Sequence, residues 1–425
     1  MRALPKFMAG ALAALLLAAV LLAALAWHAL APRPGEWAMA LRVWKFERQA
    51  SVPTLLRWAT HPLALPWLDG RRFGDWQVHT EGEGAHRLAA RCAPCRVRLG
   101  GLGSQPVVID EARLSIDIRG ADRFDGTLRL GRGERPATLA WRAELQHDGL
   151  GVHAELPATP LARVLAAFEA SIPELRQAQV QGSVALGLEG RLDAAGWRVT
   201  KLRPTLADIA VAGLGTEALR DVDVAQRCRP QPDGGRIEGW IQNAVIAAED
   251  QRFFEHPGYE LDAWVAVLKA NQRVDSRSGG LLQGASTITQ QLAKLLYTGD
   301  ERDAARKLRE WLYAVEMERT LGKGRILQLY LALLPWGDGV CGAEAAARHH
   351  LGKSANRLKP REAAWLASLL VNPDQQLRRW GADEAGARER AAWVLKGIRR
   401  LPRERREAEL DALVAWRPPV GRVDR

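Results

Sequence analysis

The sequence predicts a multi-domain protein with an N-terminal transmembrane helix, a β-rich middle domain and a C-terminal all-α domain. Three observations carry this prediction. Residues 8–31 form an apolar run without formal charge, residues 76–225 alternate apolar with polar side chains, and apolar residues beyond residue 235 recur at helical intervals. Alternation with a period of about two indicates strands, and recurrence every three to four residues indicates helices. The 425 residues suffice for about two or three domains.

Residues 1–32 are the predicted membrane anchor. The run Met8–Ala31 is long enough to cross about 30 Å of hydrocarbon as a helix. Arg2 and Lys6 precede it, which places the N-terminus on the cytoplasmic side. The alternative, a cleaved signal peptide, would have an apolar region of about 7–15 residues. We therefore expect an uncleaved anchor, with the chain beyond it outside the cytoplasm.

Residues 33–228 are predicted to form a β-rich extracytoplasmic domain. Its first part, residues 33–75, is rich in Trp and predicts a short helical linker with Trp37 and Trp44 at the membrane interface. Strands are predicted from residue 76 to residue 225, where apolar and polar side chains alternate between Gly and Asp turns. One helical interruption is expected at residues 160–178. We see no catalytic constellation here and predict a structural or partner-binding role.

The chain contains four cysteines, Cys92, Cys95, Cys228 and Cys341. The first two have the spacing of a redox motif or of half a zinc site. A zinc site needs four ligands and no second pair follows, and no redox βαβ pattern surrounds the motif. In an oxidising compartment a structural disulfide is the simplest interpretation. The sequence leaves the pairing open.

The chain carries a formal net charge of +11. Such a balance favours anionic partners, which include nucleic acid, an acidic membrane surface and a phosphorylated substrate. The basic residues are mostly Arg and are dispersed among acids, and no nucleic-acid motif is evident. We therefore expect a membrane or phosphate partner and no nucleic acid.

The C-terminal domain is predicted over residues 229–400, after the break "RPQPDGG" at residues 229–235. Its helical pattern is interrupted by the cluster "EDQRFFEHPGYE", Glu249–Glu260. A solvated turn would not need the two Phe residues, and a core helix would not need the acids and the His. This mixture indicates carboxylates at the mouth of a cleft. Residues 401–425 are left as a C-terminal tail.

A helix is predicted over "STITQQLAKLL", with Ser286 as its N-cap. Thr287, Gln290, Gln291 and Lys294 would share one polar face of that helix, because they are three, four and seven residues apart. Hydroxyl, amide and ammonium groups suit a sugar-phosphate ligand. The alternative is a solvated face without a ligand.

The stretch "RKLRE" places Arg306, Lys307 and Glu310 on one helix face. Two cations beside the acid favour its ionised form and could bind a pyrophosphate. Taken alone, such a group is more often a surface ion pair worth less than about 1 kcal/mol.

In this order the stretches resemble the peptidoglycan glycosyltransferases (glycosyltransferase family 51), which include the monofunctional biosynthetic transglycosylases and the polymerase domain of penicillin-binding proteins. The resemblance covers residues 230–400. The matching motifs are "EDQRFFEHPG" (249–258), "GASTITQQLAK" (284–294), "RKLRE" (306–310) and "KGRILQLYL" (323–331), followed by the closing helices "GAEAAARHHLGK" (342–353) and "REAAWLASLLVNP" (361–373).

The resemblance implies a lysozyme-like helical fold at the outer face of a bacterial cytoplasmic membrane. It implies polymerisation of lipid II into β-1,4 glycan, with inversion and release of undecaprenyl pyrophosphate. Glu249 would be the general base, and Glu310 would act at the pyrophosphate, directly or through a divalent ion such as Mg²⁺ or Mn²⁺. No organic cofactor is expected. The residues that would contact substrate are Asp250, Ser286, Thr287, Gln290, Gln291, Lys294, Arg306 and Lys307.

The match departs from the family pattern at a few positions. Ala285 replaces a Gly, Leu295 an Asn, Gln328 a Glu and Ala332 an Asn, and "HLG" at residues 350–352 replaces Tyr-Phe-Gly. Both predicted catalytic acids are kept. The departures bear on how the substrate is positioned, and therefore on turnover.

Three functions follow from these residues. The first is a membrane-anchored polymerase without transpeptidase activity, since no Ser-x-x-Lys motif is found. The second is a catalytically weak relative that binds lipid II or scaffolds wall-synthesis partners through residues 76–225. The third is a lytic enzyme, which the cations Lys294, Arg306 and Lys307 argue against, because a hydrolase has no pyrophosphate to hold.

Overall fold

The computed structural model describes residues 25, 28–43, 46–81, 86–97, 105–222, 236–271, 286–299, 304–337 and 339–418. In the part described, no helix is long and apolar enough to cross a membrane. Most of the predicted anchor lies outside the described residues, and so do Trp44, Cys228 and residues 272–285.

The chain divides into two compact units. The β-rich unit comprises residues 1–97, 108–170 and 182–207, and the helical unit comprises residues 98–107, 171–181 and 208–425. The boundary therefore does not follow sequence order, because two short segments within the predicted β-rich domain belong to the helical unit.

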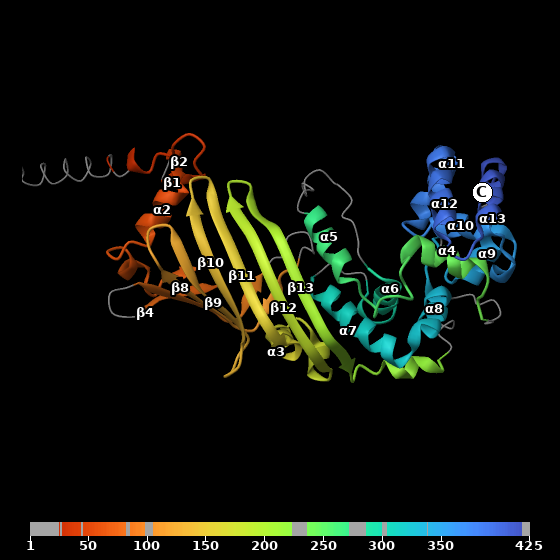
Figure 1. Ribbon diagram of the computed structural model, residues 1–425, viewed down its shortest axis with the longest axis horizontal. Helices are drawn as coiled ribbons and strands as arrows, with labels where there is room; N and C mark the ends of the chain where they lie inside the picture. The colour runs from red at the N-terminus through yellow and green to blue at the C-terminus, as the bar shows by residue number, and fades with distance from the viewer. Residues whose placement is uncertain are drawn as a thin grey trace, which may run out of the picture. The chain divides into compact units, whose positions relative to one another are not determined.

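The β-rich unit is built on one antiparallel sheet of nine strands, in the order β13-β12-β11-β10-β9-β8-β5-β4-β3 (Figure 1). Neighbours in the sheet are mostly neighbours in sequence, as expected when tight Gly and Asp turns join the strands. The strands predicted from residue 76 onward are thus confirmed as far as Ala212, where β13 ends. The strands are β3 (Arg72–Phe73), β4 (Trp76–Glu81), β5 (Arg87–Cys92), β8 (Ala112–Ile118), β9 (Arg123–Leu130), β10 (Ala137–Gln146), β11 (Gly149–Pro160), β12 (Gln179–Asp193) and β13 (Gly196–Ala212).

Strand register gathers the apolar side chains on one face of this sheet. Leu88, Ile116, Gly126, Trp141 and Ala154 are successive partners across five strands. Because side chains alternate between faces, these residues point to the same side.

Short helices pack against this face at opposite ends of the strands. At one end α2 (Val52–Ala59) places Leu56 beside Phe124 and Leu145. At the other end lies α3 (Leu161–Leu165) (Figure 1), and Ala167 of the following η2 (Ala166–Phe168) packs beside Ala112. The predicted helical interruption at residues 160–178 is confirmed by α3, η2 and η3 (Pro173–Arg176).

The predicted helical linker over residues 33–75 is wrong in its first half. β1 (Ala38–Val43) and β2 (Phe46–Ser51) form an antiparallel hairpin before α2 begins at its N-cap Ser51. Leu41 and Val43 alternate with polar residues, a strand signal that the Trp content obscured. Trp37 packs against the core of the sheet. This packing explains the presence of a Trp here, and contact with a membrane is not needed to explain it.

The disulfide expected of the C-x-x-C motif is present between Cys92 and Cys95, both buried at the junction of β5 and β6 (Cys95–Val97). β6 pairs with β7 (Val107–Ile109) in a separate two-stranded sheet. Cys341 of the helical unit is also disulfide-bonded.

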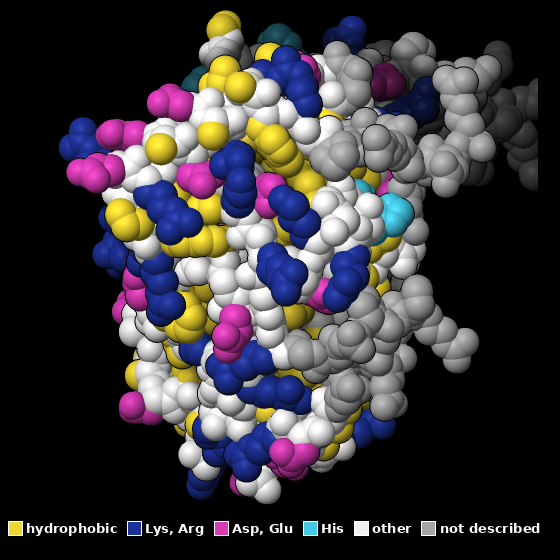
Figure 2. All heavy atoms as spheres, turned by 90° about the vertical axis from the view of Figure 1, so that its right-hand side faces the viewer, with side chains coloured by type: hydrophobic (Ala, Val, Ile, Leu, Met, Phe, Trp, Pro, Cys, Tyr) yellow, Lys and Arg dark blue, Asp and Glu magenta, His cyan; other side chains and the backbone are white. Residues whose placement is uncertain are grey.

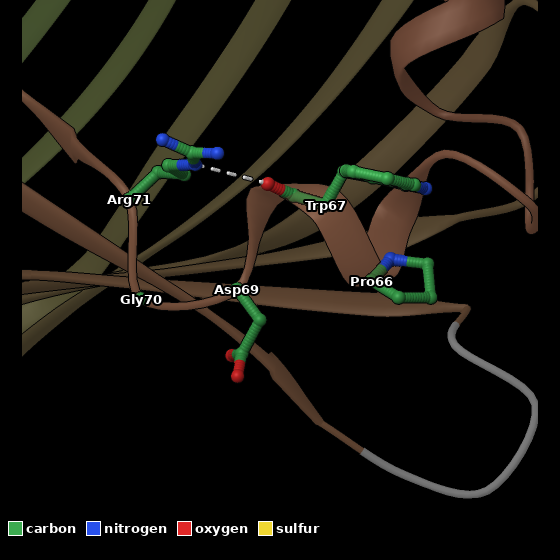
Figure 3. Close-up of a pocket in the computed structure, with 5 residues that line it drawn as sticks. All are labelled: Pro66, Trp67, Asp69, Gly70 and Arg71. Atoms are coloured by element: carbon green, nitrogen blue, oxygen red, sulfur yellow. Dashed lines mark hydrogen bonds between the residues drawn. The ribbon is translucent and has the colours of Figure 1, made fainter.

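An open pocket lies in the turn between η1 (Leu65–Leu68) and β3, lined by Pro66, Trp67, Asp69, Gly70 and Arg71 (Figure 3). Its polar groups form hydrogen bonds with the backbone of the turn and of the neighbouring strand. The Arg71 guanidinium donates to the Trp67 carbonyl at 3.3 Å, and Asp69 accepts from the Thr80 amide at 2.9 Å. This pocket holds no pair of groups arranged for acid-base chemistry.

The helical unit confirms the all-α prediction for the C-terminal half. Its core contains the fully buried rings of Trp336, Trp365, Tyr330 and Phe253. The helices are α4 (Trp240–Glu249), α5 (Leu261–Asn271), α6 (Ile288–Ala293), α7 (Ala304–Thr320), α8 (Gly322–Leu333), α9 (Ala343–Leu351), α10 (Pro360–Ser368), α11 (Pro373–Ala382), α12 (Glu384–Gly397) and α13 (Arg403–Ala415), with the short turns η4 (Thr216–Arg220), η6 (Lys294–Thr298) and η7 (Ala355–Arg357).

The segment that enters the helical unit after β13 is fixed to α7. Glu316 is buried, and its carboxylate accepts hydrogen bonds from the backbone amides of Leu214 and Thr216. Arg220 donates to the carbonyl of Thr320 at 2.7 Å. A buried carboxylate is stabilised when it accepts from such fixed donors, so these contacts hold α7 in register with the chain that precedes the helical domain.

Basic side chains are dispersed over the surface, as the sequence suggested. Figure 2 shows Lys and Arg side chains spread over one face and interspersed with acids. Several of the Arg residues of α12 and α13 are in ion pairs, for example Arg388 with Glu384 and Arg403 with Glu407.

Candidate active site

Glu249 is the last residue of α4, whose buried side chains Ile241, Ala244 and Val245 anchor the helix in the core. Glu249 is half-buried as a residue, and protein surrounds most of its carboxylate. Burial raises the pKa of Glu249, and this effect exceeds the lowering caused by a hydrogen bond from Gln291 and by the charge of Arg390. A carboxylate whose pKa is raised in this way is a stronger base than an ordinary Glu carboxylate.

Asp250, the next residue, ties together three parts of the site. It is buried, and both of its oxygens lie 2.9 Å from Nε2 of His256. One of them also accepts from the amide of Ile288 at the start of α6, at 2.9 Å. His256 in turn accepts from the amide of Gly258 through Nδ1. Asp250 therefore fixes the turn after α4 and the N-terminus of α6, which accords with a positioning role for this corner.

The N-cap of α6 is Thr287, and the prediction of Ser286 in that position is wrong by one residue. The Thr287 hydroxyl accepts from the amide of Gln290 and donates to the carbonyl of Gly258 at 2.6 Å. The side-chain oxygen of Gln290 accepts a hydrogen bond from the Thr287 amide, which completes a capping box. Both side chains are buried in this cap. Their predicted contact with substrate stays a prediction.

Gln291 is the residue of α6 that reaches Glu249. Its Nε2 donates to Oε2 of Glu249 at 3.0 Å, and its Oε1 accepts from the hydroxyl of Tyr330 at 2.6 Å. Tyr330 lies on α8 and is fully buried.

Sequence reasoning missed Tyr330 and Arg390 as parts of the site. Arg390 lies on α12, and its charge acts on Glu249 from a position more than a hundred residues away in sequence. Burial lowers the pKa of Arg390. Tyr330 lies within the quoted fourth motif, but no spacing rule connects it with Gln291 or Glu249. Only the packing of α6 against α8 could have shown the contact.

The predicted pyrophosphate cluster is assembled on the first turns of α7. Glu310 is fully buried, and its two oxygens accept from Arg306 and from Lys307, the latter at 2.7 Å. Lys307 also donates to the hydroxyl of Ser286 at 2.6 Å, and about a third of its side chain is exposed. The structure thus brings Ser286, Lys307 and Glu310 together. It excludes the interpretation of "RKLRE" as a mere surface ion pair.

Lys294 begins η6, a π-helical turn that directly continues α6. Single π-helical turns within helices are often found at functional sites. Lys294 is half-buried.

The residues around Glu310 do not fit a resident metal ion. Both carboxylate oxygens are already bonded to cations, and the side chain is buried. Within the described ranges no group of three or more His, Cys, Asp and Glu side chains could hold a metal. A divalent ion at Glu310 would have to displace Arg306 or Lys307.

One departure from the family pattern has a structural reason. The amide of Gln328 donates to the carbonyl of Ile237 at 2.8 Å and accepts from the amide of the same residue at 3.0 Å. A Glu in this position could accept from the backbone but could not donate to it when ionised. Leu295 is exposed and Ala332 is half-buried, and nothing in the structure explains these two departures.

Replacing Gln328 by Glu is expected to lower the free energy of unfolding of the helical unit by about 1–3 kcal/mol, because one carboxylate oxygen would face the carbonyl of Ile237. Urea unfolding followed by Trp fluorescence measures this change. The matched control is Gln375→Glu, an exposed residue in the first turn of α11, where a negative charge is tolerated. Equal stability of Gln328→Glu and wild type would contradict the proposed pairing.

The geometry brings the carboxylate of Glu249 to one side of α6 and a cluster of cations to its N-terminal end. Comparisons with known proteins identify the family. A family model described as Transglycosylase matches residues 219–399. A protein named biosynthetic peptidoglycan transglycosylase from Ectopseudomonas mendocina is 44% identical over 163 residues, which cover 38% of this chain and 64% of that protein. Its namesake from Nitrosomonas eutropha is 44% identical over 141 residues, covering 33% and 56%.

A third protein of that name, from Stutzerimonas stutzeri, is 39% identical over 182 residues, which cover 42% of this chain and 70% of that protein. The chain belongs to the transglycosylase family, and the resemblance noted in the sequence is confirmed. The chain spans 64% of the length of the first relative and 56% of the length of the second.

Proposed function

We propose that this chain is an inverting peptidoglycan glycosyltransferase that polymerises lipid II into β-1,4 glycan strands and releases undecaprenyl pyrophosphate, without transpeptidase activity. The observation that carries the proposal is the pair of sites that α6 connects. Gln291 of α6 donates to the carboxylate of the half-buried Glu249, and Ser286, just before α6, accepts from Lys307 of the cation cluster. A glycosyl transfer from a pyrophosphate donor needs both a base and a cationic site.

Glu249 would remove the proton from the 4-hydroxyl of the acceptor sugar while that oxygen attacks the anomeric carbon of the donor. The C–O bond to the pyrophosphate breaks as the new glycosidic bond forms, and the proton ends on Glu249. Within the described residues, Oε2 of Glu249 accepts from Gln291 and Oε1 accepts no hydrogen bond, so Oε1 is the atom placed to receive the proton.

The cations would stabilise the negative charge that develops on the leaving pyrophosphate. Lys307 is the best placed of them, because it is partly exposed and is held between Ser286 and Glu310. Arg306 and Lys294 would add to the positive potential. Glu310 would act by fixing Arg306 and Lys307 in place, since both of its oxygens are occupied. Preorganised charges of this kind stabilise a transition state without a cost of reorganisation during the reaction.

Purified protein incubated with labelled lipid II in detergent tests the proposal. A ladder of glycan products on a gel is expected, and intact lipid II after long incubation would contradict it. Omitting Mg²⁺ and adding EDTA shows whether a divalent ion is required. Feeding polymerised glycan tests for lytic activity, and fragments would favour a hydrolase.

The scaffold remains the second candidate function, and the departures at Ala285 and Ala332 favour it. A scaffold would bind lipid II without forming polymer. The structural reason found for Gln328 removes one of the departures on which this candidate depended.

The membrane anchor, the periplasmic location and the lysozyme-like arrangement belong to the same proposal. The uncharged run Met8–Ala31 supports a single-pass anchor in the bacterial inner membrane. N-terminal sequencing of the mature protein that began near Pro32 would refute it.

A partner role is proposed for the β-rich unit, which would bind other proteins of wall synthesis. Its disulfide suits an oxidising compartment, and its open pocket holds no catalytic pair. Photo-crosslinking in cells from the exposed Trp67 would identify such a partner. Crosslinks that reach no protein of wall synthesis would argue against this role.

A further inference from the structure

We propose that Tyr330 is a positioning residue for Glu249: its hydroxyl fixes the amide of Gln291 so that the amide nitrogen, not the amide oxygen, faces the carboxylate. The inference rests on the proposed function, in which Glu249 is the base. In this proposal the hydroxyl of Tyr330 keeps the carboxylate of Glu249 oriented so that it can accept a proton.

Three helices build a hydrogen-bond relay that runs from Tyr330 through Gln291 to Glu249. α8 supplies Tyr330, α6 supplies Gln291 and α4 ends with Glu249. The phenol donates to Oε1 of Gln291 at 2.6 Å, and Nε2 of Gln291 donates to Oε2 of Glu249 at 3.0 Å. Tyr330 is fully buried, so water does not compete for its hydroxyl.

The direction of the relay follows from donor and acceptor chemistry. An ionised carboxylate only accepts hydrogen bonds, whereas an amide has one end that accepts and one that donates. If the Gln291 amide turned over, its oxygen would lie against the oxygen of Glu249, and two acceptors repel each other. The Tyr330 hydroxyl holds the amide oxygen away from Glu249. Burial, with the negative charges of Glu249 and Asp250, raises the pKa of Tyr330 well above its ordinary value, so the phenol remains a donor.

Other charged groups around Glu249 also affect the ionisation of its carboxylate. Arg390 of α12 favours the ionised carboxylate, and Asp250 beside it disfavours that form. On α10, which packs against α4, Arg361 is paired with Glu409.

The other charged residue of α10, Glu362, is paired with Lys353. On α8, Lys323 is paired with Glu318. Removing the phenol hydroxyl changes none of these charges, so an effect on Glu249 reports the relay itself.

Tyr330→Phe removes the hydroxyl and keeps the ring. We expect kcat for polymerisation to fall about tenfold while KM stays within about twofold, because the substrate does not contact this residue. The acidic limb of the rate profile should move to higher pH, since the ionised form of Glu249 loses a fixed donor and its pKa rises. The matched control is Tyr313→Phe, which changes another buried Tyr of the helical unit, on α7. The acidic limb of the rate profile of this variant should stay at the pH of the wild type.

A second readout does not depend on catalysis. A water-soluble carbodiimide modifies carboxyl groups in their protonated form, and peptide mass spectrometry can follow modification of Glu249 as pH is raised. Modification is expected to persist to higher pH in Tyr330→Phe than in wild type. If wild type forms no polymer from lipid II, the proposed function fails, and this titration still decides the relay.

Gln291→Leu covers the case in which Tyr330→Phe does not fold, since it removes the amide and leaves the phenol in place. Its titration should shift in the same direction and at least as far. Circular dichroism confirms that each variant is folded. A folded Tyr330→Phe, or a folded Gln291→Leu, whose Glu249 titrates as in wild type would overturn the proposal.

Discussion

Replacing Glu249 by Gln is expected to lower the rate of glycan polymerisation by about 10²–10⁴-fold, the usual contribution of a general base. The amide keeps the shape of the side chain but cannot take the proton of the acceptor hydroxyl. Initial rates with labelled lipid II, measured at matched protein concentration, give the ratio. Binding of lipid II should be nearly unchanged, because the cations on α7 remain in place.

The pH dependence of the wild type gives a check on the same residue. The base must be deprotonated to act, and burial raises the pKa of Glu249. The rate should therefore fall as pH decreases through a value above the ordinary range of a Glu carboxyl. The control Glu255→Gln changes an exposed acid of the cluster Glu249–Glu260. It should leave both the rate and its dependence on pH unchanged. An acidic limb at the position of an ordinary Glu would argue against Glu249 as the base.

Replacing Asp250 by Asn is expected to lower the free energy of unfolding of the helical unit by about 1.5–3 kcal/mol and to impair activity as well. In wild type the carboxylate accepts from His256 and from the amide of Ile288, and it is buried. The amide nitrogen of Asn cannot accept, so one of these buried donors loses its partner. The start of α6 then shifts, and with it Gln291. Urea unfolding and initial rates on the same preparation measure both effects.

The control for this change is again Glu255→Gln, since Glu255 is paired with Arg252 and Arg399 at the surface. Exposed pairs contribute little, so its stability should stay within about 0.5 kcal/mol of wild type. If Asp250→Asn were as stable as this control and equally active, the network around His256 would not position α6.

The local patterns in the sequence predicted most of the fold. Period-two alternation located the strands of the nine-stranded sheet, and the change to a helical period located the helical unit. Residues 38–51 were misassigned because Trp37 suggested a membrane interface, whereas the structure places it against the core of the sheet. The N-cap of α6 was missed by one residue, since Ser286 and Thr287 are both good caps and only the contact with Gly258 selects the second.

The site was predicted where its residues are close in sequence. Arg306, Lys307 and Glu310 share one helix face, so helical geometry alone brings them together. The environment of Glu249 was not predictable in this way. Gln291, Tyr330 and Arg390 reach it from α6, α8 and α12, and their effect on the carboxylate depends on tertiary packing.

The stoichiometry of the products tests the account most directly. Wild-type protein and labelled lipid II would be sampled over time, and both the new glycosidic bonds and the released undecaprenyl pyrophosphate would be counted. A polymerase that uses Glu249 as its base and the α7 cations at the leaving group predicts one pyrophosphate for each new bond. Glycan cleavage without pyrophosphate release, or binding of lipid II with neither product, would contradict it.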